Sequence, residues 1–235
     1  MIDSSPLYAI PGTMCDQQLW QFLGPQLEQP LVHIPIPNAD SVPGLVRALL
    51  AQLPDTPVDL LGFSLGGYLA AALVVAAPDR FARVMVCANS PCALPADEVK
   101  QRRQLLAWVQ CQGYGGLSDR KIAQMVAPAN LANHTITGCM KAMDQRMGQA
   151  VLVSQLSATS DRRDLYRPLA ALGAKVTYCY GEQDRLVNRD WMAAIGRHAP
   201  VCELPGAGHM LPLEAPALLA REINQWRTAS IVPQT

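Results

Sequence analysis

Short apolar runs alternate with longer amphipathic segments over both ends of the chain. The apolar runs lie at residues 7–10, 31–37, 58–61, 84–88, 175–180 and 201–204. Runs of this length between Gly and Pro residues are typical of buried strands. Apolar residues recur at helical spacing over residues 41–54, 65–77, 190–198 and 216–226. Since strands joined by helices pair in parallel, the alternation predicts an α/β fold with a doubly wound, mostly parallel sheet of about six strands.

The middle of the chain lacks this alternation. Helical patterns follow one another there without a strand, over residues 95–112, 118–126, 134–147 and 149–157. We interpret residues 94–165 as a helical cap over the sheet edge, inserted into a core formed by residues 1–93 and 166–235. The alternative is that these helices form one more packing layer of the core.

The strand at residues 58–61 leads into a Gly-x-Ser-x-Gly turn around Ser64, and an Ala-rich helix follows. In this context the turn holds the Ser in a strained backbone conformation and presents its hydroxyl at the top of the sheet. Gly62 and Gly66 are expected because the turn has no room for side chains on either flank. Amides at the start of the helix face any anion that forms beside the Ser. Ser64 is therefore the candidate nucleophile, and an ordinary strand-to-helix turn is the alternative.

Two polar residues that suit a serine nucleophile follow later strand ends. Asp184 comes after the strand at 175–180, and His209 comes after the strand at 201–204. Because the carboxyl ends of the strands share one edge of the sheet, both are expected beside Ser64. A serine hydroxyl needs an imidazole to take its proton, and the imidazole needs a carboxylate to fix its tautomer. The three residues meet these needs.

Other carboxylates and histidines remain as alternatives at this point. Glu182 or Asp161 could be the acid in place of Asp184. The histidines other than His209 are expected at the surface or in the cap, because none follows a Gly-rich strand exit. These are His33, His134 and His198.

Composition and charge exclude several classes of protein. Half of the 235 residues are hydrophobic and 16% are charged, which fits a buried sheet and excludes disorder. The formal net charge is zero and no Lys/Arg tract occurs, so nucleic acid and anionic membranes are not expected as main partners. No long apolar run and no signal peptide occur, which predicts a soluble, cytoplasmic protein.

Cysteine spacing and glycine patterns bear on cofactors. The seven Cys residues are scattered and include no Cys-x-x-Cys pair, so we expect reduced thiols rather than disulfides. No spacing of His, Cys and Asp suggests a metal site, and no Gly-x-Gly-x-x-Gly follows a strand. We therefore predict no metal and no cofactor.

These motifs resemble those of a compact α/β-hydrolase with a helical cap. The resemblance rests on four segments: Pro11-Gly12-Thr13, Gly62-Phe63-Ser64-Leu65-Gly66-Gly67, Gly181-Glu182-Gln183-Asp184 and Gly206-Ala207-Gly208-His209. The chain is most similar to small intracellular esterases such as the pimeloyl-carrier-protein methyl esterases, and to the cofactor-free lyases of menaquinone synthesis. It departs from the family at Pro11, where His is usual.

The resemblance implies a role for each residue of the site. Ser64 would be the nucleophile, His209 the general base and then acid, and Asp184 the orienting acid. The amides of Leu65 and Thr13 would form the oxyanion hole. The expected activity is cleavage of a carboxylic ester or thioester through an acyl-enzyme. The alternatives are a carbon–carbon hydrolase or cofactor-free lyase with the same triad, and a ligand-binding protein without catalysis.

Apolar and basic residues suggest partners for the site. An acyl group could be bound by seven apolar side chains: Met14, Trp108, Met140, Met143, Leu186, Val187 and Met210. Any of them could equally belong to the core. The basic residues of the cap indicate a solvated surface or, alternatively, a landing surface for an acyl-carrier protein or coenzyme A.

Overall fold

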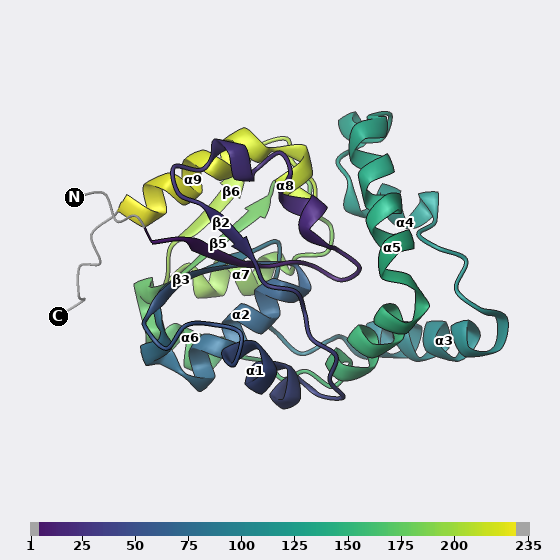
Figure 1. The fold of residues 1–235 in the computed structure, drawn as a ribbon, viewed down its shortest axis with the longest axis horizontal. Coiled ribbons are helices and arrows are strands. Elements are labelled where there is room, and N and C mark those ends of the chain that lie inside the picture. The colour runs from purple at the N-terminus through teal and green to yellow at the C-terminus, as the bar shows by residue number, and fades with distance from the viewer. Residues whose placement is uncertain (1–4, 229–235) are drawn as a thin grey trace.

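The computed structural model describes residues 5–228, which form a parallel sheet with helices on both faces (Figure 1). The sheet has six strands in the order β2-β1-β3-β4-β5-β6, and every neighbouring pair is parallel. The strands are β1 Leu7–Ile10, β2 Leu31–His33, β3 Val58–Phe63, β4 Phe81–Cys87, β5 Val176–Gly181 and β6 Val201–Leu204. The predicted fold and strand number are confirmed. The expectation about a signal peptide falls largely on residues 1–4, outside the described part.

The strands in the middle of the sheet are buried along their whole length. All six residues of β3 and all six of β5 are buried, whereas the edge strand β2 is partly exposed. Helices on both faces leave no solvated side to the middle strands, which explains their continuous apolar runs. One charge, Asp59 in β3, is buried and binds Arg83 at 3.1 Å and Arg227 at 2.9 Å.

Six α-helices pack around the sheet. They are α1 Val42–Leu50, α2 Leu65–Ala76, α6 Tyr166–Leu172, α7 Arg189–Ile195, α8 Leu211–Glu214 and α9 Pro216–Thr228. Five short 3-10 helices lie in the connections of the chain: η1 Gln17–Trp20, η2 Gly24–Gln26, η3 Pro78–Arg80, η4 Pro128–Asn130 and η5 Gly173–Lys175. The sequence did not predict α6 and α8. Helix α6 buries only Leu169 and so shows no apolar stripe, and the four residues of α8 are too few for a clear apolar period. The predicted second strand, at 31–37, is cut short before Pro35, which cannot donate to a ladder.

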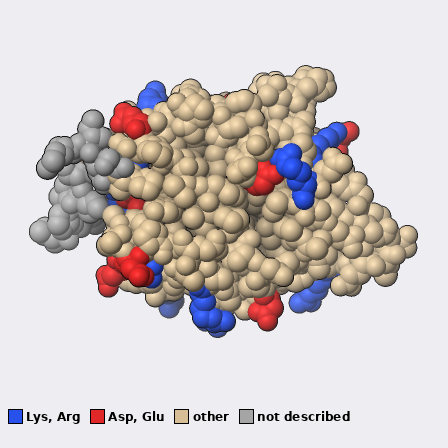
Figure 2. Space-filling view, viewed as in Figure 1, with Lys and Arg blue, Asp and Glu red and all other residues tan. Residues whose placement is uncertain are grey.

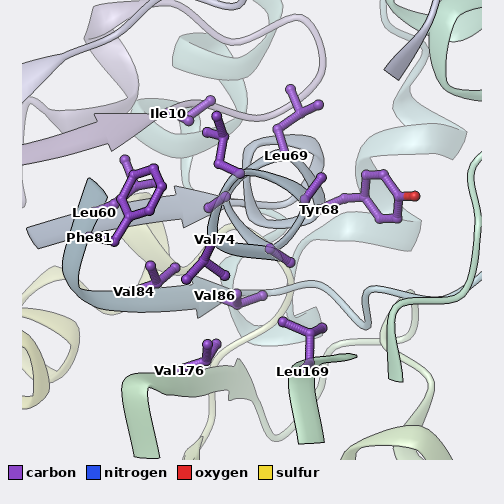
Figure 3. Packing of buried hydrophobic residues seen from close by; sticks show 14 of the residues in the cluster. Ile10, Leu60, Tyr68, Leu69, Val74, Phe81, Val84, Val86, Leu169 and Val176 are labelled. Carbon is purple, nitrogen blue, oxygen red and sulfur yellow. The ribbon is translucent and has the colours of Figure 1, made fainter. Parts of the chain in front are cut away.

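Helix α2 lies at the centre of the largest apolar cluster (Figure 3). Ten of its twelve residues are buried. Figure 3 shows Val74 of α2 close to Val84 and Val86 of β4, with Leu169 of α6 nearby. Each such fully buried side chain contributes about 1.5–3 kcal/mol to folding. The helix that follows Ser64 is therefore firmly fixed to the sheet.

Three further helices lie together on one side of the sheet (Figure 1). They are α3 Ala96–Gln112, α4 Asp119–Met125 and α5 His134–Thr159. Helix α5 is kinked at Gly148, where φ is 72°, so the two helices predicted at 134–147 and 149–157 meet at this residue. The division into a core and a cap at residues 94–165 stays a prediction. None of the helices in residues 5–228 is long and apolar enough to cross a membrane.

Candidate active site

Ser64 lies on a strained turn between β3 and α2. Its φ is 52° and its ψ is −116°, a conformation that L-residues rarely adopt. The two flanking positions have no room for a side chain, which explains why both are glycine. A Cβ on Gly62 would lie 2.3 Å from the Gly66 carbonyl oxygen, and one on Gly66 would lie 2.2 Å from the Ile10 carbonyl oxygen. The predicted strain at Ser64 and the need for both glycines are confirmed.

His209 joins Ser64 to Asp184. His209 Nε2 lies 2.9 Å from Ser64 Oγ, and His209 Nδ1 lies 2.8 Å from Asp184 Oδ2. The Asp and His side chains are buried, while Ser64 is half-buried. A carboxylate can only accept a hydrogen bond, so Nδ1 carries the ring proton and Nε2 is left to accept from the serine hydroxyl. The structure thus brings together the three residues predicted from the strand ends.

The loop that holds Asp184 is fixed by backbone contacts with the loop that holds His209. A Cβ on Gly181 would lie 2.2 Å from the carbonyl oxygen of Gly208. The amide of Leu186 donates to Asp184 Oδ1 at 2.8 Å, which orients the carboxylate. Glu182, one of the alternative acids, instead accepts from the Gly206 amide at 2.8 Å. Asp161, the other alternative, is exposed between α5 and α6.

Within residues 5–228, Ser64 forms no hydrogen bond with any of the other histidines. His134 and His198 are exposed, as expected. His33 differs from the expectation, because it is half-buried and its Nδ1 accepts from Trp20 Nε1 at 3.0 Å. Burial lowers the pKa of His33, an effect that the nearby Asp16 carboxylate partly offsets.

The loop after β1 passes beside Ser64. A Cβ on Gly12 would lie 3.1 Å from Ser64 Cβ. Within residues 5–228 the amides of Thr13 and Leu65 donate to no other residue, so both are free for a ligand. Their role as an oxyanion hole stays a prediction. The next residue, Met14, has a φ of 56° and is thus the second strained residue near the site.

Glu214 connects the His209 loop to the segment after α4. Its Oε2 accepts from the Ala127 amide at 2.7 Å and from the Gly208 amide at 3.2 Å, and its Oε1 accepts from the Met210 amide at 2.9 Å. The Asn130 side chain is a further donor, at 3.1 Å. This role of Glu214 was not predicted from the sequence. Its signal was a lone carboxylate within the apolar segment after His209.

The same segment also contacts His209 directly. The His209 amide donates to the carbonyl oxygen of Met125, the last residue of α4, at 2.7 Å. A Cβ on Gly208 would lie 2.5 Å from the Ala127 nitrogen. The backbone around the histidine is therefore fixed by the helices inserted between β4 and β5.

The seven residues proposed to bind an acyl group lie in different surroundings. Met14 packs with Leu152 and Leu156, in a small cluster of its own. Met140, Met143 and Met210 belong to the apolar cluster around Phe63, and Val187 belongs to the cluster around α2. Trp108 and Leu186 are 53% and 46% exposed. Five of the seven are thus buried in three separate clusters and two are exposed, and their role in binding an acyl group stays a prediction.

Some of the basic side chains in α3, α4 and α5 pair with acidic ones. Ion pairs join Lys141 to Asp119 at 2.6 Å and Arg102 to Glu98 at 2.9 Å. The face in Figure 2 shows the same mixture, with Lys and Arg near Asp and Glu at several places. Contact with an acyl-carrier protein or coenzyme A stays a prediction. Among residues 5–228, no three His, Cys, Asp or Glu side chains are grouped to hold a metal ion.

The structure is similar to several solved α/β hydrolases. An esterase from Thermogutta terrifontis is 20% identical with a TM-score of 0.80, over 94% of this chain and 88% of that one. An enol-lactonase from Burkholderia xenovorans LB400 is 14% identical with a TM-score of 0.84, over 97% of this chain and 92% of that one. At these identities the likeness establishes the fold.

The amino-acid sequence also matches one characterised protein and one family profile. The dihydrolipoyllysine-residue acetyltransferase component of the acetoin cleaving system of Pseudomonas putida is 25% identical over an alignment of 240 residues. The alignment covers 94% of this chain. The match spans 62% of that protein's length. Residues 28–222 match the profile of the alpha/beta hydrolase family. The chain therefore belongs to the alpha/beta hydrolase family.

Proposed function

We propose that this protein is a serine hydrolase that cleaves a carboxylic ester or thioester, with Ser64, His209 and Asp184 as its catalytic triad. The observation that carries the proposal is the continuous chain of hydrogen bonds from Asp184 Oδ2 through the His209 ring to Ser64 Oγ, at 2.8 and 2.9 Å. The hydroxyl at its end lies on a half-buried, strained turn, where a substrate can reach it.

Each residue has a defined step in this mechanism. Ser64 Oγ attacks the carbonyl carbon while His209 Nε2 takes its proton. The negative charge that forms on the carbonyl oxygen is stabilised by the free amides of Thr13 and Leu65. His209 then protonates the departing alcohol or thiol, which leaves an acyl group on Ser64. Water, activated by His209, releases the acid in a second passage through the same steps.

The buried Asp184 carboxylate stabilises the positive charge that His209 gains when it takes the serine proton. The imidazolium forms in a site where the His209 side chain is only 4% exposed and the Phe63 ring lies 5.4 Å away. A cation in such surroundings is costly without a counter-charge, and the buried carboxylate supplies one. The Leu186 amide in turn satisfies the second oxygen of Asp184.

The names of the similar proteins fit acyl chemistry. The solved neighbours include an esterase, an enol-lactonase and a thioesterase domain, and the Pseudomonas relative is an acetyltransferase component. One fold hosts many reactions, so these names support the proposal less than the geometry of the three side chains does.

Hydrolysis of p-nitrophenyl esters and acyl thioesters of rising chain length tests the proposal. We expect Ser64→Ala to lower kcat roughly 10⁴- to 10⁶-fold, as loss of a triad nucleophile does. Asp184→Asn should be strongly impaired and Glu182→Gln, at the other carboxylate of that loop, nearly unaffected. Turnover that persists in Ser64→Ala would contradict the proposal. Inertness of the wild type toward every ester and thioester would direct attention to carbon–carbon bonds or to ligand binding.

A further inference from the structure

Helix α5 reaches the loop that contains the proposed oxyanion amide. The Met14 amide donates to Gln155 Oε1 at 3.0 Å, across 141 residues of sequence. Both residues are buried, with 7% and 3% exposure. Met14 packs with Leu152 and Leu156 of the same helix, so this polar contact lies in apolar surroundings. A buried amide without a partner is unfavourable, which makes the Gln155 oxygen important for the conformation of the loop.

The peptide unit between Thr13 and Met14 is held at both of its polar atoms. The Thr13 carbonyl oxygen accepts from Cys15 Sγ at 3.4 Å, and the Met14 amide donates to Gln155. The φ of Met14 is 56°, in the left-handed region that residues other than Gly rarely adopt. Such a conformation persists only where the surrounding contacts enforce it. The hydrogen bond with Gln155 is one of these contacts.

The other end of the loop is fixed by the turn of the nucleophile. A Cβ on Gly66 would lie 2.2 Å from the Ile10 oxygen and 2.5 Å from the Pro11 oxygen, so the chain leaves β1 in close contact with α2. The Thr13 amide lies between this packed end and the peptide that Gln155 holds. Gln155 is therefore placed to set the direction of that amide.

Further contacts join Gln155 to the neighbouring helix. The Gln155 carbonyl oxygen accepts from Thr159 Oγ1 at 2.6 Å, and Thr159 Oγ1 accepts from Arg102 of α3 at 3.3 Å. On the other side of the Gly148 kink, Arg146 of α5 binds Asp16 at 2.7 Å. Helix α5 thus holds both ends of the segment from Met14 to Asp16.

We propose that Gln155 is a positioning residue for the oxyanion hole. By accepting from the Met14 amide, it holds the Thr13 amide in the direction needed to donate to the substrate oxyanion, and it makes this geometry depend on the docked position of α5. The inference rests on the function proposed above.

The test uses Gln155→Met, which keeps the length of the side chain but removes the acceptor. Since an oxyanion donor acts in the transition state, we expect kcat for a p-nitrophenyl ester to fall about 10- to 100-fold while KM changes little. Phenylboronic acid forms a tetrahedral adduct on the serine, so its inhibition constant should rise by a similar factor. Ser157→Ala, an exposed position on the same helix, is the control and should behave as wild type.

A purely structural role would give a different result. If Gln155→Met lowers Tm but keeps the wild-type kcat and boronate affinity, the inference is overturned while the proposed function stands. An inactive wild-type protein would overturn the proposed function, and the inference with it. Should Gln155→Met not fold, Thr159→Val detaches the same helical turn from Arg102. It should lower kcat with KM unchanged, and an unaltered kcat would overturn the inference.

Discussion

Helices α2 and α3 are built in opposite ways. Ten of the twelve residues of α2 are buried, whereas Val109 is the one buried residue among the seventeen of α3. Apolar side chains on α3 such as Leu105 and Trp108 are 39% and 53% exposed. The nucleophile is thus attached to a heavily buried helix, while some of the contacts that hold the surrounding loops come from the segment between β4 and β5 that contains α3. Substitutions around α2 should therefore lower the free energy of unfolding more than substitutions in the segment that contains α3.

The largest effect is expected from Gly66→Ala. The new methyl group would meet the backbone oxygens of Ile10 and Pro11 at 2.2 and 2.5 Å, and neither can move without displacing β1. We expect the free energy of unfolding to fall by more than about 4 kcal/mol, or the protein not to fold. Urea unfolding followed by circular dichroism measures this.

Gly148→Ala is the matched substitution in the insertion. An added Cβ there would have nothing within 4 Å, so the cost comes only from the φ of 72° and should be about 1–3 kcal/mol. Equal losses of stability at Gly66 and Gly148 would contradict the contrast between the two regions.

Glu214→Gln tests the connection between the regions. The amide group offers one oxygen where the carboxylate serves four donors, so some of the Ala127, Gly208 and Met210 amides lose their partner. We expect a loss of about 1–3 kcal/mol in unfolding free energy. We also expect a lower kcat, because the His209 loop is held by these contacts.

A surface carboxylate provides the control for Glu214. Glu203→Gln removes an exposed ion pair with Arg189, which should cost below about 1 kcal/mol. Unfolding experiments and ester hydrolysis on both variants give the comparison. A Glu214→Gln protein that matches Glu203→Gln in both measurements would show that the carboxylate does not link the two regions.

Two neighbouring residues on α3, one buried and one exposed, should differ in how much their replacement lowers the free energy of unfolding. Val109→Ala removes a fully buried side chain and should cost about 1–3 kcal/mol through lost burial and a residual cavity. Trp108→Ala, at an exposed position, should change stability by less than about 0.5 kcal/mol. Chemical unfolding compares the two. A KM for long acyl esters that rises in Trp108→Ala would support the predicted role of this residue in binding the acyl group.

A small effect that depends on pH is expected at Asp16. Partial burial is the largest single influence and opposes ionisation. The hydrogen bonds from Arg146 and from the Gln18 amide, with the positive charge of Arg146 nearby, together outweigh it and lower the pKa of Asp16 below its ordinary value of 3.8. A lowered pKa stabilises the folded state above 3.8, and this contribution is lost as the pH falls through the folded pKa. Asp16→Asn should therefore lower Tm slightly at neutral pH and not in acid, with a cost below about 1 kcal/mol. A difference in Tm that grows in acid would contradict this sign.

Local signals explain which parts of the fold could be predicted. The segment from β3 to α2 was predicted almost to the residue, because a continuous apolar run, two obligatory glycines and a closing Pro78 mark it. Helix α8 was missed, since four residues give no period. The kink in α5 was visible as a break between two helical patterns at Gly148.

The residues of the site also fall into those that the sequence predicts and those that it does not. Ser64, Asp184 and His209 follow strand ends, and parallel strands deliver such residues to one edge. The roles of Glu214 and Gln155 were not predicted, because neither residue follows a strand end and the sequence does not show that they meet the Ala127 and Met14 amides, 87 and 141 residues away. An acyl pocket was not predictable either, since apolar residues suit a pocket and a core equally well.

The most direct test of the central claim is intact-mass spectrometry after treatment with a fluorophosphonate, followed by peptide mapping. An activated serine predicts one adduct, on Ser64, that is absent from both Ser64→Ala and His209→Ala. No adduct on folded wild-type protein, or an adduct that persists in His209→Ala at the wild-type rate, would contradict the claim that the hydrogen-bonded chain from Asp184 to Ser64 activates the hydroxyl.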